Sequence, residues 1–427
     1  MPKEELEPIP PDILSFTELS AWHEFTRDPE TFGKRGAVVT VKLPEGTRAD
    51  QVRSVVGEIS ARHEIFRTSY HAPGGRPARR VLPFCEHKVA ESRPPALAAA
   101  PADGGDARLM PGDLFRVWVS PGLGGPRSIS LGLHEMITDN LSCARLSAEV
   151  GQLMSGAGPA PPEASYAEYA REERRRPVPP DLAGYWRRAF AGLGRHPGIP
   201  ADGPDPSGDQ AGEWILILPD HLGQALRAVS QANRVSLFMV VTALLNMTIA
   251  AMYGAEDITL ATTASMRAKR FASVQGNFSN VTVTRTAIPP GAPFTEVLAA
   301  TREAVLGALR HQPVPFAQLK DLIGETLEAP RIRVHYLPRH THHYSTTLDT
   351  KPSGAAWQED TDFSGWPLDL GFAEDSSGRV AIWANYDPRL FTHATVRAVV
   401  SAYQRLLALV AADGTLTCRD LRRQVAA

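Results

Sequence analysis

Cysteine is scarce in this sequence, and its few copies are scattered. Cys85, Cys143 and Cys418 are the only three in 427 residues. No two of them have the spacing of a metal-ligand pair, and three isolated cysteines make no disulfide framework. The scarcity excludes a disulfide-stapled fold and a paired-cysteine zinc site. It is typical of a protein in a reducing, cytoplasmic compartment.

An excess of charge of one sign is also missing. The formal net charge is −2, with 45 Lys and Arg against 47 Asp and Glu. A chain without a strong basic field has no general electrostatic attraction to nucleic acid or to an anionic membrane surface. We therefore expect neither a nucleic-acid partner nor a membrane partner.

Long uninterrupted apolar runs are absent as well. The longest, residues 236–253, is broken by Thr242, Asn246 and Thr248. A bilayer span needs roughly 20 predominantly apolar residues, so this run predicts a buried core helix. The N-terminal stretch is acidic and proline-rich and lacks the basic-then-apolar order of a signal peptide.

The sequence does contain alternating helix and strand patterns, which predict an α/β protein. Residues 49–64 repeat apolar side chains at helical spacing, whereas residues 127–134 alternate as a half-buried strand does. A chain of this length is too long for one ordinary core. The proline- and arginine-rich stretch 159–180 is the best boundary, which predicts an N-terminal subdomain 1–180 and a C-terminal subdomain 181–427.

The stretch LHEMITDN, residues 133–140, ends the predicted strand in polar side chains. If the strand continues, Glu135 shares the parity of Leu131 and Leu133 and points to the buried side. A buried carboxylate acts as a base only when desolvation raises its pKa, and otherwise it must be paired. From the residues alone, catalysis by Glu135 and a purely structural role are both open.

Several stretches, in order, resemble motifs of the condensation domains of nonribosomal peptide synthetases, which belong to the chloramphenicol-acetyltransferase-like superfamily. They are LSFTELSAWHEFTRDPE (14–30), RHEIFRTSY (62–70), HEMITDN (134–140), the helix–strand–arginine segment 236–267, GNFSNVTVTR (276–285), PVPFAQL (313–319) and ANYDPRLF (384–391). The resemblance covers nearly the whole chain. It implies two acetyltransferase-like α/β subdomains in a V-shaped pseudo-dimer with a central tunnel, with HEMITDN on the N-terminal subdomain.

The family's active-site motif is HHxxxDG, and its second histidine is the reactive one. The resemblance implies that Glu135, in that place, is the base or positioning group, supported by His134. An ionised Glu135 would repel a developing oxyanion, so it is a better base than oxyanion stabiliser. Asp139 is expected to pair with Arg267, the arginine ending TTASMR, and to hold the loop. Asn140 replaces glycine; asparagine tolerates a left-handed backbone, and its side chain could narrow the tunnel.

Three further residues are predicted to line the substrate channel. Asn280 corresponds to a family asparagine near the channel, although a turn residue that satisfies backbone groups fits equally well. His335 and Tyr336 could line the channel or pack in the walls. The histidines that follow have no acidic or cysteine neighbour, so we expect a polar loop near the tunnel and no metal site. These histidines are His340, His342 and His343.

The resemblance implies a free-standing acyltransferase of antibiotic or related secondary metabolism. It would join a carrier-bound acyl or aminoacyl thioester to an amine or hydroxyl acceptor. It would need no cofactor of its own, because phosphopantetheine arms of carrier proteins present the substrates. Heterocyclisation relatives with acidic residues in the motif remain catalytic, whereas other altered relatives serve as docking platforms. A non-catalytic docking protein, for carrier proteins or tailoring enzymes, is therefore the alternative, and an acyltransferase using a soluble acyl-coenzyme A is a third.

Overall fold

The chain divides into two compact units. The computed structural model describes residues 13–33, 35–93, 107–122, 125–193, 198–203, 212–323, 330–337, 366–374 and 378–425. Unit 1 consists of Met1–Pro177 and Arg267–Phe278, and unit 2 of Val178–Met266 and Ser279–Ala427.

The sequence predicts two continuous subdomains with a boundary after residue 180. In the structure the boundary lies between Pro177 and Val178, and residues 267–278 return to unit 1. Arg267 explains this return, because its guanidinium is ion-paired with Asp139 of unit 1.

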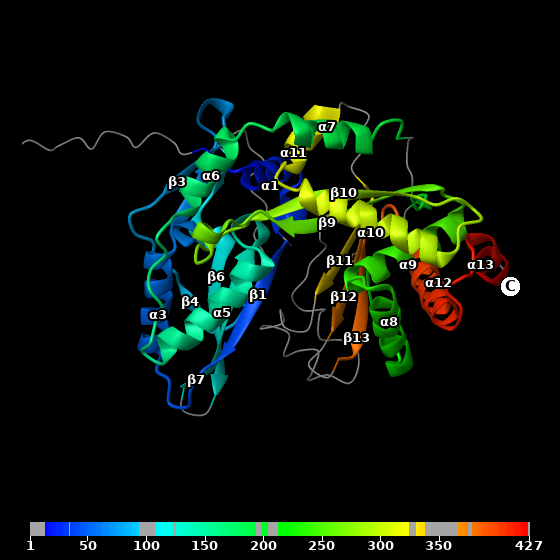
Figure 1. Ribbon diagram of the computed structural model, residues 1–427. Helices are drawn as coiled ribbons and strands as arrows, with labels where there is room; N and C mark the ends of the chain where they lie inside the picture. Colours follow the sequence, from blue (N-terminus) through cyan, green and yellow to red (C-terminus); the bar gives the residue numbers. More distant parts are fainter. Residues whose placement is uncertain are drawn as a thin grey trace, which may run out of the picture. The chain divides into compact units, whose positions relative to one another are not determined.

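Unit 1 contains two small sheets (Figure 1). The four-stranded sheet has the order β1-β7-β6-β4, with β1 (Gly36–Lys42), β7 (Gly125–His134), β6 (Phe115–Gly122) and β4 (Val89–Ala90). The three-stranded sheet has the order β3-β2-β5, with β3 (Ala78–Val81), β2 (Thr68–His71) and β5 (Arg108–Leu109). Strands β1 and β7 are antiparallel, with Gly36 opposite His134, so the start of β1 lies beside the end of β7.

The unit 1 helices follow their sequence signals. They are α1 (Phe16–Arg27), α2 (Pro29–Gly33), α3 (Ala49–Arg62), α4 (Pro111–Leu114), α5 (Asn140–Met154) and α6 (Tyr166–Arg175). Ser15 starts α1 through a capping box with Glu18, in which each side chain binds the other residue's backbone N–H. Helix α3 forms where the sequence predicts it and buries the apolar stripe that carries the prediction.

Unit 2 is built on one six-stranded sheet of order β10-β9-β11-β12-β13-β8. The strands are β8 (Gly212–Ile217), β9 (Asp257–Ser265), β10 (Ser279–Ala287), β11 (Ile332–Leu337), β12 (Leu368–Glu374) and β13 (Val380–Tyr386). The helices are α7 (Pro180–Ala189), α8 (Asp220–Asn233), α9 (Leu237–Tyr253), α10 (Phe294–Arg310), α11 (Phe316–Ile323), α12 (His393–Ala412) and α13 (Cys418–Val425). Together, the units confirm the predicted α/β class.

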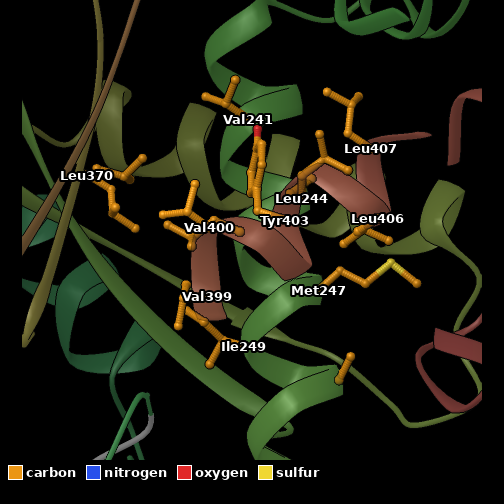
Figure 2. Packing of buried hydrophobic residues seen from close by; sticks show 14 of the residues in the cluster. Val241, Leu244, Met247, Ile249, Leu370, Val399, Val400, Tyr403, Leu406 and Leu407 are labelled. Atoms are coloured by element: carbon orange, nitrogen blue, oxygen red, sulfur yellow. The ribbon is translucent and has the colours of Figure 1, made fainter. Parts of the chain in front are cut away.

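The core of unit 2 surrounds α9, the helix predicted from the longest apolar run. Ser236 caps it, and 13 of its 17 residues are buried. Figure 2 shows Val241, Leu244 and Met247 of α9 among apolar side chains of α12. Alternate residues of β11, β12 and β13 complete the cluster, which places α9 and α12 on the same face of the sheet.

Two stretches of unit 2 are apolar enough to cross a membrane by length and composition alone. They are α12, and α8 with α9 taken as one span bent by 106°. In the structure α12 packs against α8 and α9, and its apolar stripe lies in the unit 2 core. This packing is that of core helices.

Candidate functional site

The HEMITDN segment passes from a strand through a tight turn into a helix. Strand β7 ends at His134, a 3₁₀ turn covers Glu135–Ile137, and α5 begins at Asn140. Because the extended backbone stops at His134, strand alternation does not extend to Glu135. The condition under which Glu135 would point to the buried side is therefore not met. His134 is 6% exposed, whereas the Glu135 side chain is 38% exposed.

His134 is fixed by backbone groups at both ring nitrogens. Its Nδ1 accepts from the Met136 N–H at 3.0 Å, so Nε2 carries the proton and donates to the Phe32 carbonyl oxygen at 2.7 Å. The Phe32 ring lies against the imidazole, with centroids 3.9 Å apart. Burial lowers the pKa of His134 to about 4, because the charged imidazolium loses its hydration. The imidazole is thus neutral at physiological pH, and its contacts are those of a supporting group.

Glu135 is bound to Arg35, which stands just before β1. Nη1 of Arg35 donates to Oε1 of Glu135 at 2.7 Å, and the same Nη1 donates to the Glu24 carboxylate. The Arg35 side chain is only 10% exposed. Burial raises the pKa of Glu24, and the charge of Arg35 opposes that rise. The buried Arg35 guanidinium therefore binds two carboxylates, and the Glu135 carboxylate is the more exposed of the two.

Asp139 is a buried structural centre. One of its oxygens caps α5 by accepting from Ser142 N–H at 2.7 Å, and the other accepts from Phe278 N–H at 3.0 Å. Nη2 of Arg267 lies 3.0 Å from both oxygens. The Asp139 and Arg267 side chains are 5% and 3% exposed. The expected pair is present, and both carboxylate oxygens are occupied.

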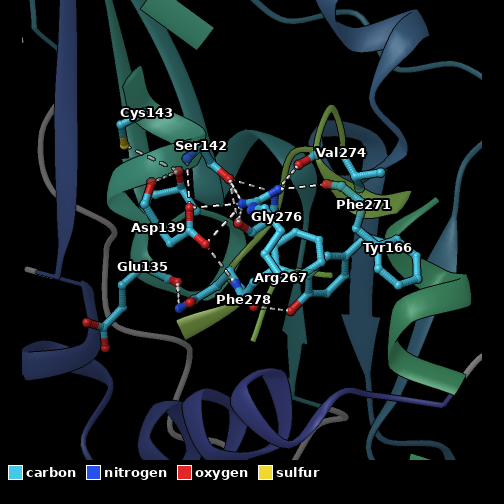
Figure 3. A network of polar contacts seen from close by, with 12 residues as sticks. Glu135, Asp139, Ser142, Cys143, Tyr166, Arg267, Phe271, Val274, Gly276 and Phe278 are labelled. Atoms are coloured by element: carbon cyan, nitrogen blue, oxygen red, sulfur yellow. Dashed lines mark hydrogen bonds and ion pairs between the residues drawn. The ribbon is translucent and has the colours of Figure 1, made fainter. Parts of the chain in front are cut away.

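Arg267 also organises the segment 267–278, which we call the clasp. Its Nη1 donates to the carbonyl oxygens of Phe271 and Val274, and its guanidinium carbon lies 3.8 Å from the centre of the Phe278 ring. Figure 3 shows these groups around Arg267, with the Glu135 carboxylate pointing away from them. The charged group thus holds the clasp in shape and anchors it on Asp139.

Further contacts join the clasp to the motif and to α6. Ser142 Oγ donates to the Gly276 carbonyl oxygen at 2.7 Å, and Asn277 Nδ2 donates to the Glu135 carbonyl oxygen at 2.7 Å. The Tyr166 hydroxyl donates to the Asn277 carbonyl oxygen at 2.5 Å. A Cβ at Gly276, whose φ is +154°, would lie 2.1 Å from Cδ2 of Tyr166. Glycine is therefore required for this close approach.

The motif offers little acid–base chemistry in this arrangement. The His134 ring nitrogens and the Asp139 oxygens are all engaged, and the Glu135 contact with Arg35 favours the ionised carboxylate. Cys143 is buried, which raises its pKa to about 12. Glu135 is thus the most accessible ionisable group of the motif, as a charged acceptor of hydrogen bonds.

The structure changes the interpretation of both asparagines. Asn140 is the first residue of α5, and among described non-glycine residues only Arg234 has a positive φ. The left-handed backbone considered for Asn140 is therefore not used. Asn280 is buried, and its Nδ2 donates to the carbonyl oxygens of Gln312 and Val314 at 2.9 Å while Oδ1 accepts from Phe316 N–H. These contacts with the α10–α11 connection are those of the backbone-satisfying alternative, and the channel role of Asn280 stays a prediction.

His335 and Tyr336 lie on opposite faces of β11, since neighbouring strand residues alternate. Tyr336 packs against the unit 2 core, which is the core-packing alternative that the sequence left open, and its channel role stays a prediction. Nδ1 of His335 lies 3.3 Å from Oδ1 of Asp369, and Trp383 lies beside the imidazole. The channel role of His335 stays a prediction. His340, His342 and His343 lie outside the described residues.

Sequence reasoning missed Arg35, Glu24 and Ser142. Arg35 reaches Glu135 because β1 pairs with β7 in a particular register, and single-sequence patterns do not reveal such pairing. Ser142 did carry a signal, because an aspartate three residues before it marks a helix N-terminus. That signal predicts the cap on α5 but not the second contact, which Ser142 makes with Gly276.

Comparison with protein families and curated sequences gives consistent matches. A family model described as Condensation domain matches residues 127–423. The probable non-canonical nonribosomal peptide synthetase CymA of Salinispora arenicola is 29% identical over 447 positions, which cover 96% of this chain and 6% of that protein. Tyrocidine synthase 3 of Brevibacillus parabrevis is 25% identical over 437 positions, covering 96% of this chain and 6% of that protein. The chain thus spans a small fraction of these relatives' length.

Solved structures share the fold at low sequence identity. The X-domain from teicoplanin biosynthesis has a TM-score of 0.75 at 19% identity, covering 97% of this chain and 98% of that chain. The condensation domain of the Monacolin K polyketide synthase MokA has a TM-score of 0.76 at 16% identity, covering 96% and 99%. These likenesses confirm the predicted condensation-domain fold.

Proposed function

Because the chain belongs to the condensation domain family, we propose that it works in nonribosomal peptide or related natural-product biosynthesis as a recruitment protein. In this role it binds carrier proteins, or a tailoring enzyme that acts on their cargo, and the HEMITDN segment does not catalyse acyl transfer. The sequence leaves this non-catalytic docking role open as the alternative to acyl transfer, and the geometry of the motif supports it better than general-base catalysis.

One observation carries the proposal: each ionisable side chain of the motif is already bound. A general base needs a lone pair directed at the acceptor and a pKa near the working pH. His134 has both nitrogens on backbone groups and a pKa of about 4. The Glu135 carboxylate accepts a hydrogen bond from the positively charged Arg35 side chain. Asp139 accepts hydrogen bonds from Arg267 and from two backbone N–H groups.

The fold is compatible with a protein partner. The X-domain from teicoplanin biosynthesis has been solved in a complex with OxyB, and this chain shares its fold with a TM-score of 0.75. At 19% identity the likeness concerns the fold alone. A carrier protein or a tailoring enzyme is therefore our proposal for this chain, with a cytoplasmic location and with any substrate presented on phosphopantetheine rather than on a resident cofactor.

Acyl transfer by Glu135 is the second candidate, and the exposure of its side chain favours it. At 38% exposed, the carboxylate is reachable. If Glu135 released Arg35 and bound an acceptor amine instead, its carboxylate would position that amine. Arg35 would still be paired with Glu24. Catalytic hydrogen bonds often shorten only when substrate is bound, so an accessible carboxylate can become a base in the substrate complex.

An assay with carrier proteins from the same gene cluster separates the two candidates. Wild type, Glu135→Gln and Glu135→His are mixed with loaded donor carriers and acceptors, and intact-protein mass spectrometry follows transfer while calorimetry follows binding. Recruitment predicts binding by all three proteins and no transfer by wild type. Transfer by wild type that falls about a hundredfold or more in Glu135→Gln would establish acyl transfer instead. Absence of binding to any carrier or tailoring enzyme would overturn recruitment.

The Glu135→His variant is the positive control for the chemistry. It restores the second histidine of HHxxxDG beside Arg35, whose charge disfavours a protonated imidazole and keeps it neutral. If this variant gains transfer that wild type lacks, the missing base is the cause of inactivity. If transfer stays absent while binding is retained, the whole site is adapted to recruitment.

A further inference from the structure

Unit 2 contains an apolar pocket to which neither the motif nor the fold comparison assigns a role. Its volume is about 280 Å³, and it lies where α9, α12 and α13 meet. The lining residues are Thr248, Ala251, Ala402, Arg405, Leu406, Ala408, Leu409 and Leu421. Leu406, a member of the apolar stripe of α12, forms part of the pocket wall and is labelled in Figure 2. The pocket belongs entirely to unit 2.

The pocket exists because small side chains stand where helices converge. Ala251, Ala402 and Ala408 fill little of the space between the helix axes. The wall from α13 is held in place, because Arg422 donates from Nε to the Ala251 carbonyl oxygen and from Nη2 to the Ala250 carbonyl oxygen, both at 3.1 Å. These contacts bind two carbonyl groups in the last turn of α9, as basic side chains commonly do. The pocket is therefore preformed by helix packing.

Its size fits a small aliphatic body. An apolar cavity of about 150 Å³ holds a benzene molecule. By that measure, 280 Å³ accommodates roughly ten to twelve non-hydrogen atoms. Leu406 and Leu421, at 3% and 1% exposure, present buried hydrocarbon to such a group.

Arg405 gives the pocket its polarity. It is the single charged residue of the lining and lies on the exposed side of α12. Within the described part of the chain, no hydrogen bond or ion pair engages its guanidinium. An arginine beside a hydrocarbon pocket suits a carboxylate, which it can bind through two parallel hydrogen bonds.

We propose that this pocket binds a medium-chain aliphatic carboxylate, with the hydrocarbon between α9, α12 and α13 and the carboxylate on Arg405. The binding is non-covalent and independent of the HEMITDN segment. The same aliphatic group could arrive as a free acid or as the acyl group of a pantetheine thioester. The free acid is the ligand we propose, because the thioester has no anionic head for Arg405.

Ligand-observed NMR titration of the full chain tests the proposal with octanoate as probe. An octanoate molecule has ten non-hydrogen atoms, for which a dissociation constant of about 0.1–1 mM is expected. Ala408→Phe fills the mouth from an exposed helix position, so it should abolish binding without unfolding the protein. Arg405→Gln should weaken octanoate binding about fivefold to tenfold. Arg397→Gln, an exposed arginine on the same helix outside the lining, is the matched control and should leave binding unchanged.

Octanol and octanoyl-pantetheine complete the test. Octanol should bind wild type about as weakly as octanoate binds Arg405→Gln. Each of these two complexes lacks the ion pair between a ligand carboxylate and Arg405. Octanoate binding that survives Ala408→Phe, or equal loss in the two arginine variants, would overturn the site. Tighter binding of octanoyl-pantetheine than of octanoate, insensitive to Arg405→Gln, would overturn the carboxylate and identify an acyl-thioester site.

Discussion

Two carboxylates of the seven-residue HEMITDN motif form ion pairs, and these pairs differ in burial and in their surroundings. Asp139 and Arg267 are 5% and 3% exposed, and backbone N–H and carbonyl groups surround them. Glu135 is 38% exposed and shares Arg35 with Glu24. Asp139 is the aspartate of the family motif HHxxxDG, and its pair with Arg267 holds the clasp. Glu135 stands where the family motif has its second histidine, so a carboxylate bound to Arg35 replaces an imidazole.

The difference shows that one motif can separate structural from chemical tasks. The Asp139 pair stabilises the clasp whether or not the protein is a catalyst. The Glu135 pair is more exposed and stabilises the fold less, so the residue at position 135 can change without loss of the fold. Measurements that compare the two pairs therefore test both the role of the clasp and the proposed function.

The largest effect is expected from breaking the clasp at Arg267. Arg267→Met leaves the buried Asp139 carboxylate without its counter-ion, which should cost about 3–5 kcal/mol of unfolding free energy. Arg270→Met is the matched control, because Arg270 lies in the same segment but forms an exposed pair with Glu172. It should cost less than about 1 kcal/mol. Urea denaturation measures both, and equal losses would contradict the structural role of Arg267.

The next effect is a pH dependence that originates at His134. Its pKa is about 4 in the folded protein against an ordinary value of 6.5. The unfolded chain therefore binds the proton first, and stability present above pH 6.5 is lost as pH falls towards 4. The interval corresponds to about 3 kcal/mol.

A variant isolates this contribution from other titrating groups. His134→Gln cannot titrate, so the stability difference between wild type and variant should shrink as pH falls from 6.5 to 4. Chemical denaturation at several pH values measures that difference. A difference that stays constant across the window would mean that His134 is not buried in its neutral form.

A smaller effect is expected from Ser142, which supports the Asp139 pair. Its Oγ donates to the Gly276 carbonyl oxygen and accepts from Arg267 Nη2 at 2.6 Å. Ser142→Ala removes both of these hydrogen bonds from a buried network, which should cost about 1–3 kcal/mol. Ser155→Ala is the control on the exposed end of the same helix, where a change within about 0.5 kcal/mol is expected. A change within about 0.5 kcal/mol at Ser142 as well would show that the clasp tolerates removal of the Ser142 hydroxyl.

Sequence reasoning reached these features unequally, for physical reasons. Helix α9 was predictable because its apolar run and its Ser236 cap are local. The Asp139–Arg267 pair joins residues 128 positions apart, and only the ordered family motifs indicated it. The side that Glu135 faces could not be predicted, because nothing in the sequence shows whether the strand continues past His134. Its contact with Arg35 depends on the β1–β7 register, which is a property of the assembled sheet.

The smallest effect concerns Glu135 itself, and it bears most directly on function. Glu135→Gln should change the unfolding free energy by less than about 1 kcal/mol, because the pair is half-exposed and solvent screens it. A double-mutant cycle with Arg35→Met measures the coupling, which we expect near 0.5–1 kcal/mol, well below that of Asp139 and Arg267. Coupling beyond about 2 kcal/mol would make the pair a second structural bridge and would remove Glu135 as an acceptor-positioning group. Weak coupling means that Glu135 can exchange Arg35 for another cation, so the transfer assay then decides between recruitment and acyl transfer.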